Sequence, residues 1–225
     1  MARILLLETS TALCSVALSE DGKVVASRED ATRQHASLTA PFVKEVLDSQ
    51  GLSVRDCDAV CVSMGPGSYT GLRVGVSTAK GLCFGAGLPL IAITSLETLA
   101  WQATDRESYR YIVPMIDARR MEVFTCVYSP SVQRLSEVEA KVIDSESFAP
   151  LLTEGPVLFA GDGAAKCQGV ITHPDAHFLQ CSPRAVSMAK AAEAAFAESR
   201  FENLAYFEPF YLKDFVATVP RRKLF

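Results

Sequence analysis

The chain has 225 residues, of which 49% are hydrophobic and 21% are charged, and its formal net charge is −4. This composition predicts a soluble globular protein of one large or two small domains. It argues against a protein that holds nucleic acid by itself, because such binding needs clustered Lys and Arg. The apolar run Ile4–Leu7 is too short for a secretory or membrane-spanning segment. The seven cysteines form no CxxC pair, so we expect buried thiols in a cytoplasmic protein without membrane contact.

Apolar runs with strand-like and helix-like periods alternate through the first half of the chain. The first run ends in the carboxylate of Glu8, and Asp21-Gly22 is typical of a tight hairpin turn between the next two strands. Gly51 closes a helical pattern that contains Pro41 near its start. The expected strands are Arg3–Glu8, Cys14–Ser19, Lys23–Ser27, Ala59–Val62 and Leu88–Ile93, and the expected helices are Ser37–Gln50, Thr70–Gly85 and one that begins at about Ser95.

The second half of the chain repeats this order. It too opens with an apolar run, a carboxylate (here Asp117), a short turn and a second strand. The expected strands are Tyr111–Ile116, Met121–Tyr128, Val138–Ile143 and Pro156–Ala160, and the expected helices are a short one at FAPLL and an alanine-rich one at Arg184–Arg200. The repeat predicts two α/β lobes related by duplication, at residues 1–106 and 107–202, followed by a C-terminal tail at 203–225.

A glycine-rich loop, GPGSYTG, leads from Gly65 into the helix expected at Thr70–Gly85. It is not a phosphate-binding P-loop, because the GK[ST] ending is missing. Ser68 and Thr70 are nevertheless good N-cap residues, and a helix N-terminus can hold an anion. The turn after Glu8 has no glycine, which limits how closely its backbone approaches a phosphate. We predict a remnant nucleotide or anion site made of Glu8, Thr9, Ser10, Ser68, Thr70 and Asp117.

The same helix carries two rows of small residues at helical spacing. One row is Gly71, Gly75 and Ala79, and the other is Thr78, Gly81 and Gly85. Each interior glycine costs about 0.5–1 kcal/mol relative to alanine, so the rows need a compensating close contact. Packing within the lobe and packing against a partner protein both explain them. The partner explanation predicts an interface of Gly71, Leu72, Gly75, Val76, Thr78, Ala79 and Leu82.

The three histidines offer little to a metal ion. His173 and His177 have HxxxH spacing, but Pro174 and the lack of apolar periodicity favour a surface loop, in which the two rings do not converge. His35 stands alone before a helix, which favours a surface or capping role. We therefore expect no metal site.

Two further segments are rich in charge or aromatic residues. The mixed charges from Asp117 to Glu122, including Arg119 and Arg120, favour a salt-bridged turn, with a position facing an inter-lobe cleft as the alternative. In the tail, we expect PFYL to dock onto the protein's own body. A basic PRRKLF end that touches tRNA or a partner is the minor alternative.

Six stretches carry a resemblance to a known family: ILLLETSTALCSVAL, GPGSYTGLRVGVSTAKGL, PLIAITSLETLA, MIDARRMEVF, GDGA and EPFYL. In this order they resemble the landmarks of the bacterial TsaB (YeaZ-like) family over nearly the whole chain. The resemblance implies a two-lobed actin-like/Hsp70-like ATPase fold with duplicated ribonuclease-H-like lobes. It also implies a part in making threonylcarbamoyladenosine, the modified base beside the tRNA anticodon. Glu8 is a departure, since the family usually has Asp there.

The resemblance also implies what the chain lacks. The catalytic paralogue of the pathway, TsaD, holds a metal through an HxxxH pair, and Ser95 and Leu99 stand at the matching positions here. Serine and leucine do not replace two imidazoles, so the resemblance implies a protein that is not an enzyme and has no metal or other cofactor, apart from weak nucleotide binding.

The partners implied by the resemblance are proteins. A non-catalytic scaffold would pair with a TsaD-like subunit through the first-lobe helices, support a TsaE-like ATPase, meet tRNA only through the complex, and form a homodimer when alone. The alternative is a nucleotide-dependent ATPase or phosphotransferase of the same superfamily, with Glu8 and Asp117 as its carboxylates.

Overall fold

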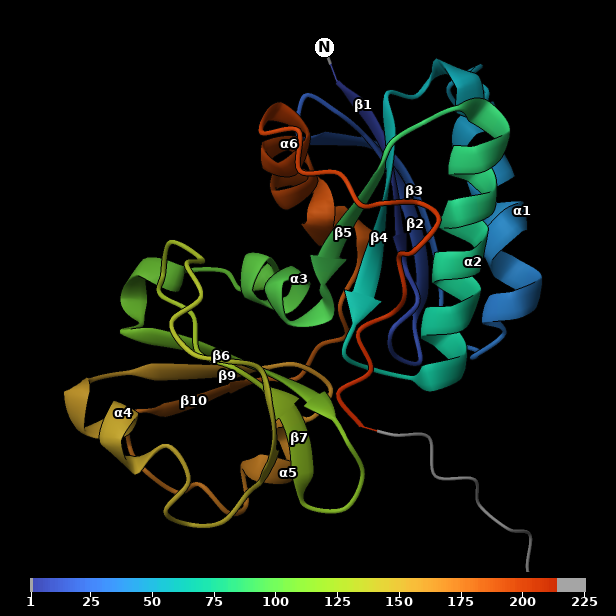
Figure 1. Cartoon of the computed structure of the whole chain (residues 1–225). Coiled ribbons are helices and arrows are strands. Elements are labelled where there is room, and N and C mark those ends of the chain that lie inside the picture. The colour runs from blue at the N-terminus through green and yellow to red at the C-terminus, as the bar shows by residue number, and fades with distance from the viewer. Residues whose placement is uncertain (1, 214–225) are drawn as a thin grey trace, which may run out of the picture.

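The computed structural model describes residues 2–213 and shows two lobes, each built on a five-stranded sheet (Figure 1). The first sheet has the order β3-β2-β1-β4-β5, with β1 (Arg3–Glu8), β2 (Cys14–Glu20), β3 (Lys23–Asp30), β4 (Ala59–Gly65) and β5 (Leu90–Thr94). The second has the order β8-β7-β6-β9-β10, with β6 (Tyr111–Asp117), β7 (Glu122–Thr125), β8 (Glu139–Val142), β9 (Val157–Ala160) and β10 (Ala176–Leu179).

The two sheets share one topology. In each lobe the first three strands form an antiparallel meander, and the fourth and fifth strands run parallel to the first. The helices repeat as well: α1 (His35–Asp48) and α4 (Ala149–Glu154) precede the fourth strand, and α2 (Tyr69–Ala86) and the short α5 (Ala164–Cys167) follow it. The predicted duplication of α/β lobes is therefore confirmed.

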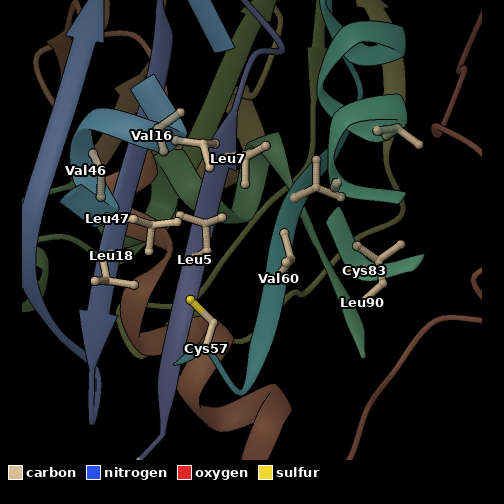
Figure 2. Packing of buried hydrophobic residues seen from close by; sticks show 14 of the residues in the cluster. Leu5, Leu7, Val16, Leu18, Val46, Leu47, Cys57, Val60, Cys83 and Leu90 are labelled. Atoms are coloured by element: carbon tan, nitrogen blue, oxygen red, sulfur yellow. The ribbon is translucent and has the colours of Figure 1, made fainter. Parts of the chain in front are cut away.

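The core of the first lobe lies on both faces of its sheet. Successive side chains of a strand point to opposite faces, so Leu5 and Leu7 of β1 pack beneath α1 and α2 (Figure 2), whereas Ile4 and Leu6 face the other side. All four side chains are fully buried. Burial on both faces explains why β1 reads as a continuous apolar run instead of an alternating one.

The second face of the first sheet is covered by residues 185–197. The 3₁₀ turn Ala185–Met188 and α6 (Ala189–Ala197) lie over this face (Figure 1). Met188 and the buried alanines of these two segments share an apolar cluster with Ile4 and Leu6. The predicted domain boundary at residue 202 is therefore wrong, because the alanine-rich helix belongs to the first lobe. Its small side chains let the helix lie close to the sheet, a long-range contact that composition alone does not reveal.

The helix α3 (Ser95–Gln102) lies between the lobes (Figure 1). It leaves β5 of the first sheet, and its Leu96 and Leu99 enter the apolar cluster of the second lobe beside Ile112 and Ile116. The lobes thus exchange their final helices: α3 packs onto the second sheet and α6 onto the first. The two lobes are therefore linked at α3 and α6.

The structure confirms the predicted hairpin turn and changes the bounds of two other predicted segments. Asp21 and Gly22 have φ of 47° and 70°, as the predicted hairpin turn needs. The segment THPDAH is only partly a loop, because its last two residues start β10. The helix expected at Arg184–Arg200 begins as the 3₁₀ turn and ends at Ala197.

Of the tail, PFYL docks on the body as predicted, and PRRKLF lies outside the described residues.

Burial of the thiols is confirmed. All seven cysteines are free and six are buried, and burial raises the pKa of the Cys57 and Cys83 thiols to about 11. Such thiols stay protonated and unreactive at neutral pH. Among residues 2–213, no helix has both the length and the apolar character that a membrane crossing requires.

Candidate functional site

A cleft of about 770 Å³ lies between the lobes, where the carboxyl ends of β1 and β6 face each other. The β1–β2 turn and the N-terminus of α2 line it from the first lobe, and the β6–β7 turn and Asp162 line it from the second. Ser10, Ser68, Thr70 and Asp117 all line this cleft, and Glu8 and Thr9 lie fully buried behind Ser10. The structure therefore brings all six residues of the predicted remnant site together.

The glycine-rich loop and the start of α2 are hydrogen-bonded to the β1–β2 turn. The N–H of Ser68 donates to Ser10 O at 2.6 Å, and Thr9 Oγ1 donates to Gly71 O at 2.8 Å. A Cβ added at Gly71 would overlap the main-chain oxygen of Thr9, and one added at Gly75 would overlap Thr9 Oγ1. The close contact that these two glycines serve is therefore inside the lobe.

This packing corrects most of the predicted partner interface. Five of its seven residues are buried within the first lobe: Gly71, Leu72, Gly75, Val76 and Ala79. Only Thr78 and Leu82 are partly exposed. A substitution at Gly75 therefore reports on folding and not on pairing with another protein.

The opposite face of α2 is exposed along the whole helix. We call this face the outer α2 stripe, and it consists of Thr70, Arg73, Ser77, Gly81, Phe84 and Gly85. Nothing lies within 4 Å of a Cβ added at Gly81 or Gly85, so no contact inside the described residues offsets the cost of these glycines. Between them, Phe84 is 85% exposed. The second small-residue row is therefore the one that remains without an explanation inside the protein.

Glu8 is a buried carboxyl group at the end of β1. Its Oε1 accepts a hydrogen bond from the N–H of Ser10 at 2.6 Å, whereas its Oε2 has no partner among the described residues. The nearby hydroxyls of Ser63 and Ser95 bond to each other at 2.7 Å. Burial raises the pKa of Glu8, and the hydrogen bond from Ser10 opposes that rise only in part.

Replacement of Glu8 tests this environment. The folded-state pKa is raised above its ordinary value of 4.5, so the carboxyl favours the fold when protonated and loses that contribution as the pH rises through the folded pKa. We expect Glu8→Gln to raise the free energy of unfolding by about 1–3 kcal/mol near pH 8. The gain should vanish below pH 4.5. Urea unfolding across this pH range measures the difference, and a variant less stable near pH 8 would contradict it.

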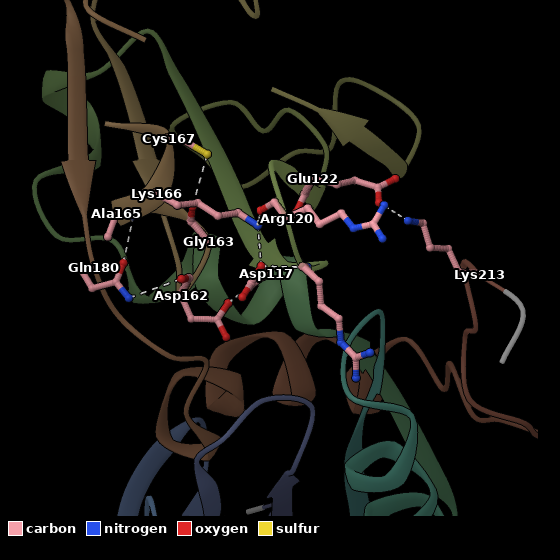
Figure 3. A network of polar contacts seen from close by, with 11 residues as sticks. Asp117, Arg120, Glu122, Asp162, Gly163, Ala165, Lys166, Cys167, Gln180 and Lys213 are labelled. Atoms are coloured by element: carbon pink, nitrogen blue, oxygen red, sulfur yellow. Dashed lines mark hydrogen bonds and ion pairs between the residues drawn. The ribbon is translucent and has the colours of Figure 1, made fainter. Parts of the chain in front are cut away.

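The β6–β7 turn of the second lobe is occupied by a lysine of the same lobe (Figure 3). Lys166 Nζ on α5 donates to the Asp117 carboxylate, to Arg120 O at 2.8 Å and to Glu122 O at 2.6 Å. Burial raises the pKa of Asp117, but the contacts of its carboxylate with Lys166 and with Arg119 together outweigh burial and lower that pKa. The turn is salt-bridged, as expected, but its carboxylates pair with Lys166 and Lys213 instead of with its own arginines. It also faces the cleft, which was the alternative expectation.

These contacts bear on whether the cleft suits a nucleotide. In a duplicated fold of this kind the two turns would hold the phosphates between them, with backbone N–H groups or cations free to face them. Here the second-lobe turn directs carbonyl oxygens inward onto Lys166, and the Asp117 carboxylate is already paired. Lys166 and Asp117 are thus occupied with each other, whereas the exposed arginines Arg33, Arg119 and Arg120 also line the cleft. Weak nucleotide binding therefore stays a prediction. The first-lobe half keeps the N-terminus of α2 facing the cleft, so a small anion there remains a prediction.

The positions predicted to lack metal ligands have other roles. Ser95 bonds to Ser63, and Leu99 is fully buried in the second-lobe cluster. His173 Nδ1 accepts a hydrogen bond from the N–H of Asp175 at 3.1 Å, whereas the His177 ring on β10 packs edge-on against Tyr109. His35 is buried at the start of α1 instead of on the surface. Residues 2–213 contain no cluster of three His, Cys, Asp or Glu that could hold a metal ion.

Sequence reasoning missed Lys166 and Asp162. Asp162 Oδ1 accepts a hydrogen bond from the Asp117 N–H at 3.0 Å, and burial raises the Asp162 pKa. The signal was present in GDGA, the counterpart in the second lobe of the loop that follows β4. Aligning the two halves strand by strand would have placed this loop, and the start of α5, at the cleft.

Comparison with known proteins agrees with this architecture. The family model described as TsaD, tRNA N6-adenosine threonylcarbamoyltransferase, matches residues 23–220. The tRNA threonylcarbamoyladenosine biosynthesis protein TsaB of Escherichia coli K12 is 34% identical, and the match covers 96% of each chain. The structure of YeaZ from Pseudomonas aeruginosa has a TM-score of 0.83 at 28% identity and covers 94% of this chain and 100% of that one.

A more distant likeness supports the fold alone. The activator of 2-hydroxyisocaproyl-CoA dehydratase from Clostridium difficile, solved with bound ADPNP, has a TM-score of 0.51 at 10% identity. The match covers 88% of this chain and 96% of that chain. The two-lobed arrangement is thus shared with a protein solved with a bound nucleotide analogue.

Proposed function

Because the chain belongs to the TsaB/YeaZ family and so has a role in tRNA threonylcarbamoyladenosine biosynthesis, we propose that it acts there as a non-catalytic scaffold. Its partner would be a TsaD-like catalytic subunit, and the pair would support a TsaE-like ATPase. The observation that carries the proposal is the outer α2 stripe. A Cβ added at its Gly81 or Gly85 would meet nothing within 4 Å, and the exposed Phe84 lies between them.

The stripe suits a partner helix for physical reasons. Glycines on a helix surface let a second backbone approach closely, and an exposed aromatic side chain is a frequent anchor of protein interfaces. The helix α1 lies beside α2 on the same face of the sheet, so the two helices present one continuous outer layer (Figure 1). Thr78 and Leu82 lie at the edge of the stripe, where a partner could still reach them.

A paralogous partner fits the same surface. The TsaD family model matches most of this chain, so a TsaD-like subunit would share the fold and present an equivalent helix layer. Two such layers can pack against each other, and in the partner's absence two copies of this chain would pair in the same way. The net charge of −4 favours contact with tRNA through the complex over independent binding.

The absence of catalysis is part of the proposal. Ser95 and Leu99 are engaged in a buried hydrogen bond and in apolar packing, and neither provides the imidazole that a transition metal would need. Lys166 fills the second-lobe turn, which supports a scaffold without a nucleotide cofactor over the ATPase alternative.

An omission experiment tests the proposed function. Purified TsaD, TsaE and threonylcarbamoyl-AMP synthase are combined with tRNA, ATP, threonine and bicarbonate, with and without this chain, and modified adenosine is quantified. We expect modification only when the chain is present. Equal modification without it would contradict the scaffold role. Binding of ATP to the isolated chain at millimolar concentration, measured by calorimetry, would instead favour the ATPase alternative.

A further inference from the structure

The end of the described chain forms a strap across the first lobe. We call Glu202–Lys213 the C-terminal strap. It follows α6, and the N–H of Glu202 donates to Leu90 O at 2.8 Å, along the free edge of β5. Phe207 is 7% exposed and enters the core beneath α2, and Lys80 Nζ donates to Phe207 O at 3.0 Å. This first part of the strap is anchored.

The strap then turns toward the cleft. The N–H of Phe210 donates to Met64 O at 2.7 Å, and Gly65 has a φ of 110°. A Cβ at Gly65 would lie 2.8 Å from Phe210 O, so only glycine admits the strap at this point. The ring of Tyr211 packs on that of Tyr69, with centroids 4.6 Å apart.

The last described residues reach the other lobe. Leu212 packs against the second-lobe cluster that contains Ile116 and Phe124. Lys213 Nζ forms an ion pair with the Glu122 carboxylate on β7 (Figure 3). All four residues of Phe210–Lys213 line the inter-lobe cleft, so this segment joins a first-lobe anchor to a second-lobe contact at the mouth of the cleft.

We infer that Phe210–Lys213 is a releasable latch that holds the two lobes together over the cleft. Its anchor at Phe207 is buried, whereas the latch residues themselves are half-exposed or exposed. Besides the contacts above, the latch accepts a hydrogen bond from Arg73 Nε to the Tyr211 hydroxyl at 3.3 Å. Segments with few buried apolar contacts open at a low cost in free energy, and an exposed ion pair adds little to stability. Release of the latch therefore leaves both lobes folded and lets them rotate apart about the connections at α3 and α6.

The distance between the lobes measures the latch directly. Nitroxide labels at Lys44→Cys on α1 and Glu139→Cys on β8, both exposed, report it in the full chain with Cys181→Ser; the other six cysteines are buried. For the parent we expect a dominant distance population and a minor, longer one. For the variant Tyr211→Ala/Leu212→Ala/Lys213→Ala we expect the longer population to become the dominant one.

A charge exchange provides the matched control. Lys213→Glu alone opposes the carboxylate of Glu122 and should enlarge the longer population by about two- to fivefold. Adding Glu122→Lys should restore the parent distribution. Hydrogen exchange of the β1 amides should be unchanged in every variant, which shows that the first lobe stays folded. If all variants keep the parent distribution, the latch is contradicted. The measurement uses the isolated chain, so its result is independent of the proposed scaffold role.

Discussion

Gly71→Ala should lower the free energy of unfolding by about 3 kcal/mol, whereas Gly81→Ala, in the same helix, should raise it by about 0.5–1 kcal/mol. For a chain of this length the first change corresponds to a fall in Tm of about 6–12 °C. Alanine is the better helix former at both positions, so propensity alone predicts a gain in each case. The difference comes from what the added methyl group meets.

At Gly71 the methyl group meets backbone. It would overlap the main-chain oxygen of Thr9, which belongs to the buried turn after β1 and has no freedom to rotate away. Relief requires α2 to move off the sheet, which would disturb the packing of Leu72 and Val76. At Gly81 the methyl group meets nothing within 4 Å, so only the helix preference acts.

A third variant separates backbone from side-chain contact. At Gly75 the overlap is with Thr9 Oγ1, a side-chain atom. Thr9→Ala should therefore rescue part of the loss caused by Gly75→Ala, but none of the loss caused by Gly71→Ala. Urea unfolding of the single and double variants gives these coupling energies. Equal stability of Gly71→Ala and Gly81→Ala would contradict the close approach of α2 to the β1–β2 turn.

The two glycine rows show where sequence reasoning ends. Their spacing correctly indicates a helix with two faces that need explanation. Spacing cannot tell which row meets the protein's own backbone, because Thr9 lies 62 residues from Gly71 and its approach is set by the pairing of β1 with β4. The row of Gly71 and Gly75 contacts Thr9 inside the lobe, which explains its glycines. The row of Gly81 and Gly85 has no such contact among the described residues.

The cleft likewise has features that the sequence predicts and features that it does not. The repeated order of apolar run, carboxylate and turn predicts that Glu8 and Asp117 end equivalent strands, and the equivalent sheets place their turns opposite each other. The occupant of the second turn was not predictable, because Lys166 is 49 residues from Asp117 and sits on a helix of four residues. The return of α6 to the first lobe was likewise hidden, since alanines suit any close-packed surface.

Phe84→Ala should weaken binding to the TsaD-like partner by about 30-fold, and Gly81→Leu should abolish it. Loss of an aromatic anchor at an interface centre costs about 2 kcal/mol or more, and 1.4 kcal/mol corresponds to a tenfold change in affinity. A leucine at Gly81 would instead hold the two backbones apart. Neither change meets another group of this chain in the described structure, since Phe84 is 85% exposed and the space at Gly81 is open. Both variants should therefore unfold at the parent's temperature or above.

The matched control is Val142→Ala on β8, because Val142 is also an exposed apolar residue, at 68%, but lies on the second lobe. It should change the affinity less than twofold. Calorimetric titration of the partner measures the three affinities, and the reconstituted modification assay should follow the same order. If Phe84→Ala and Val142→Ala bind equally well, the partner does not use the outer α2 stripe. The helix-propensity cost of Gly81 and Gly85 would then have no compensating contact, because nothing in the described structure lies near either residue.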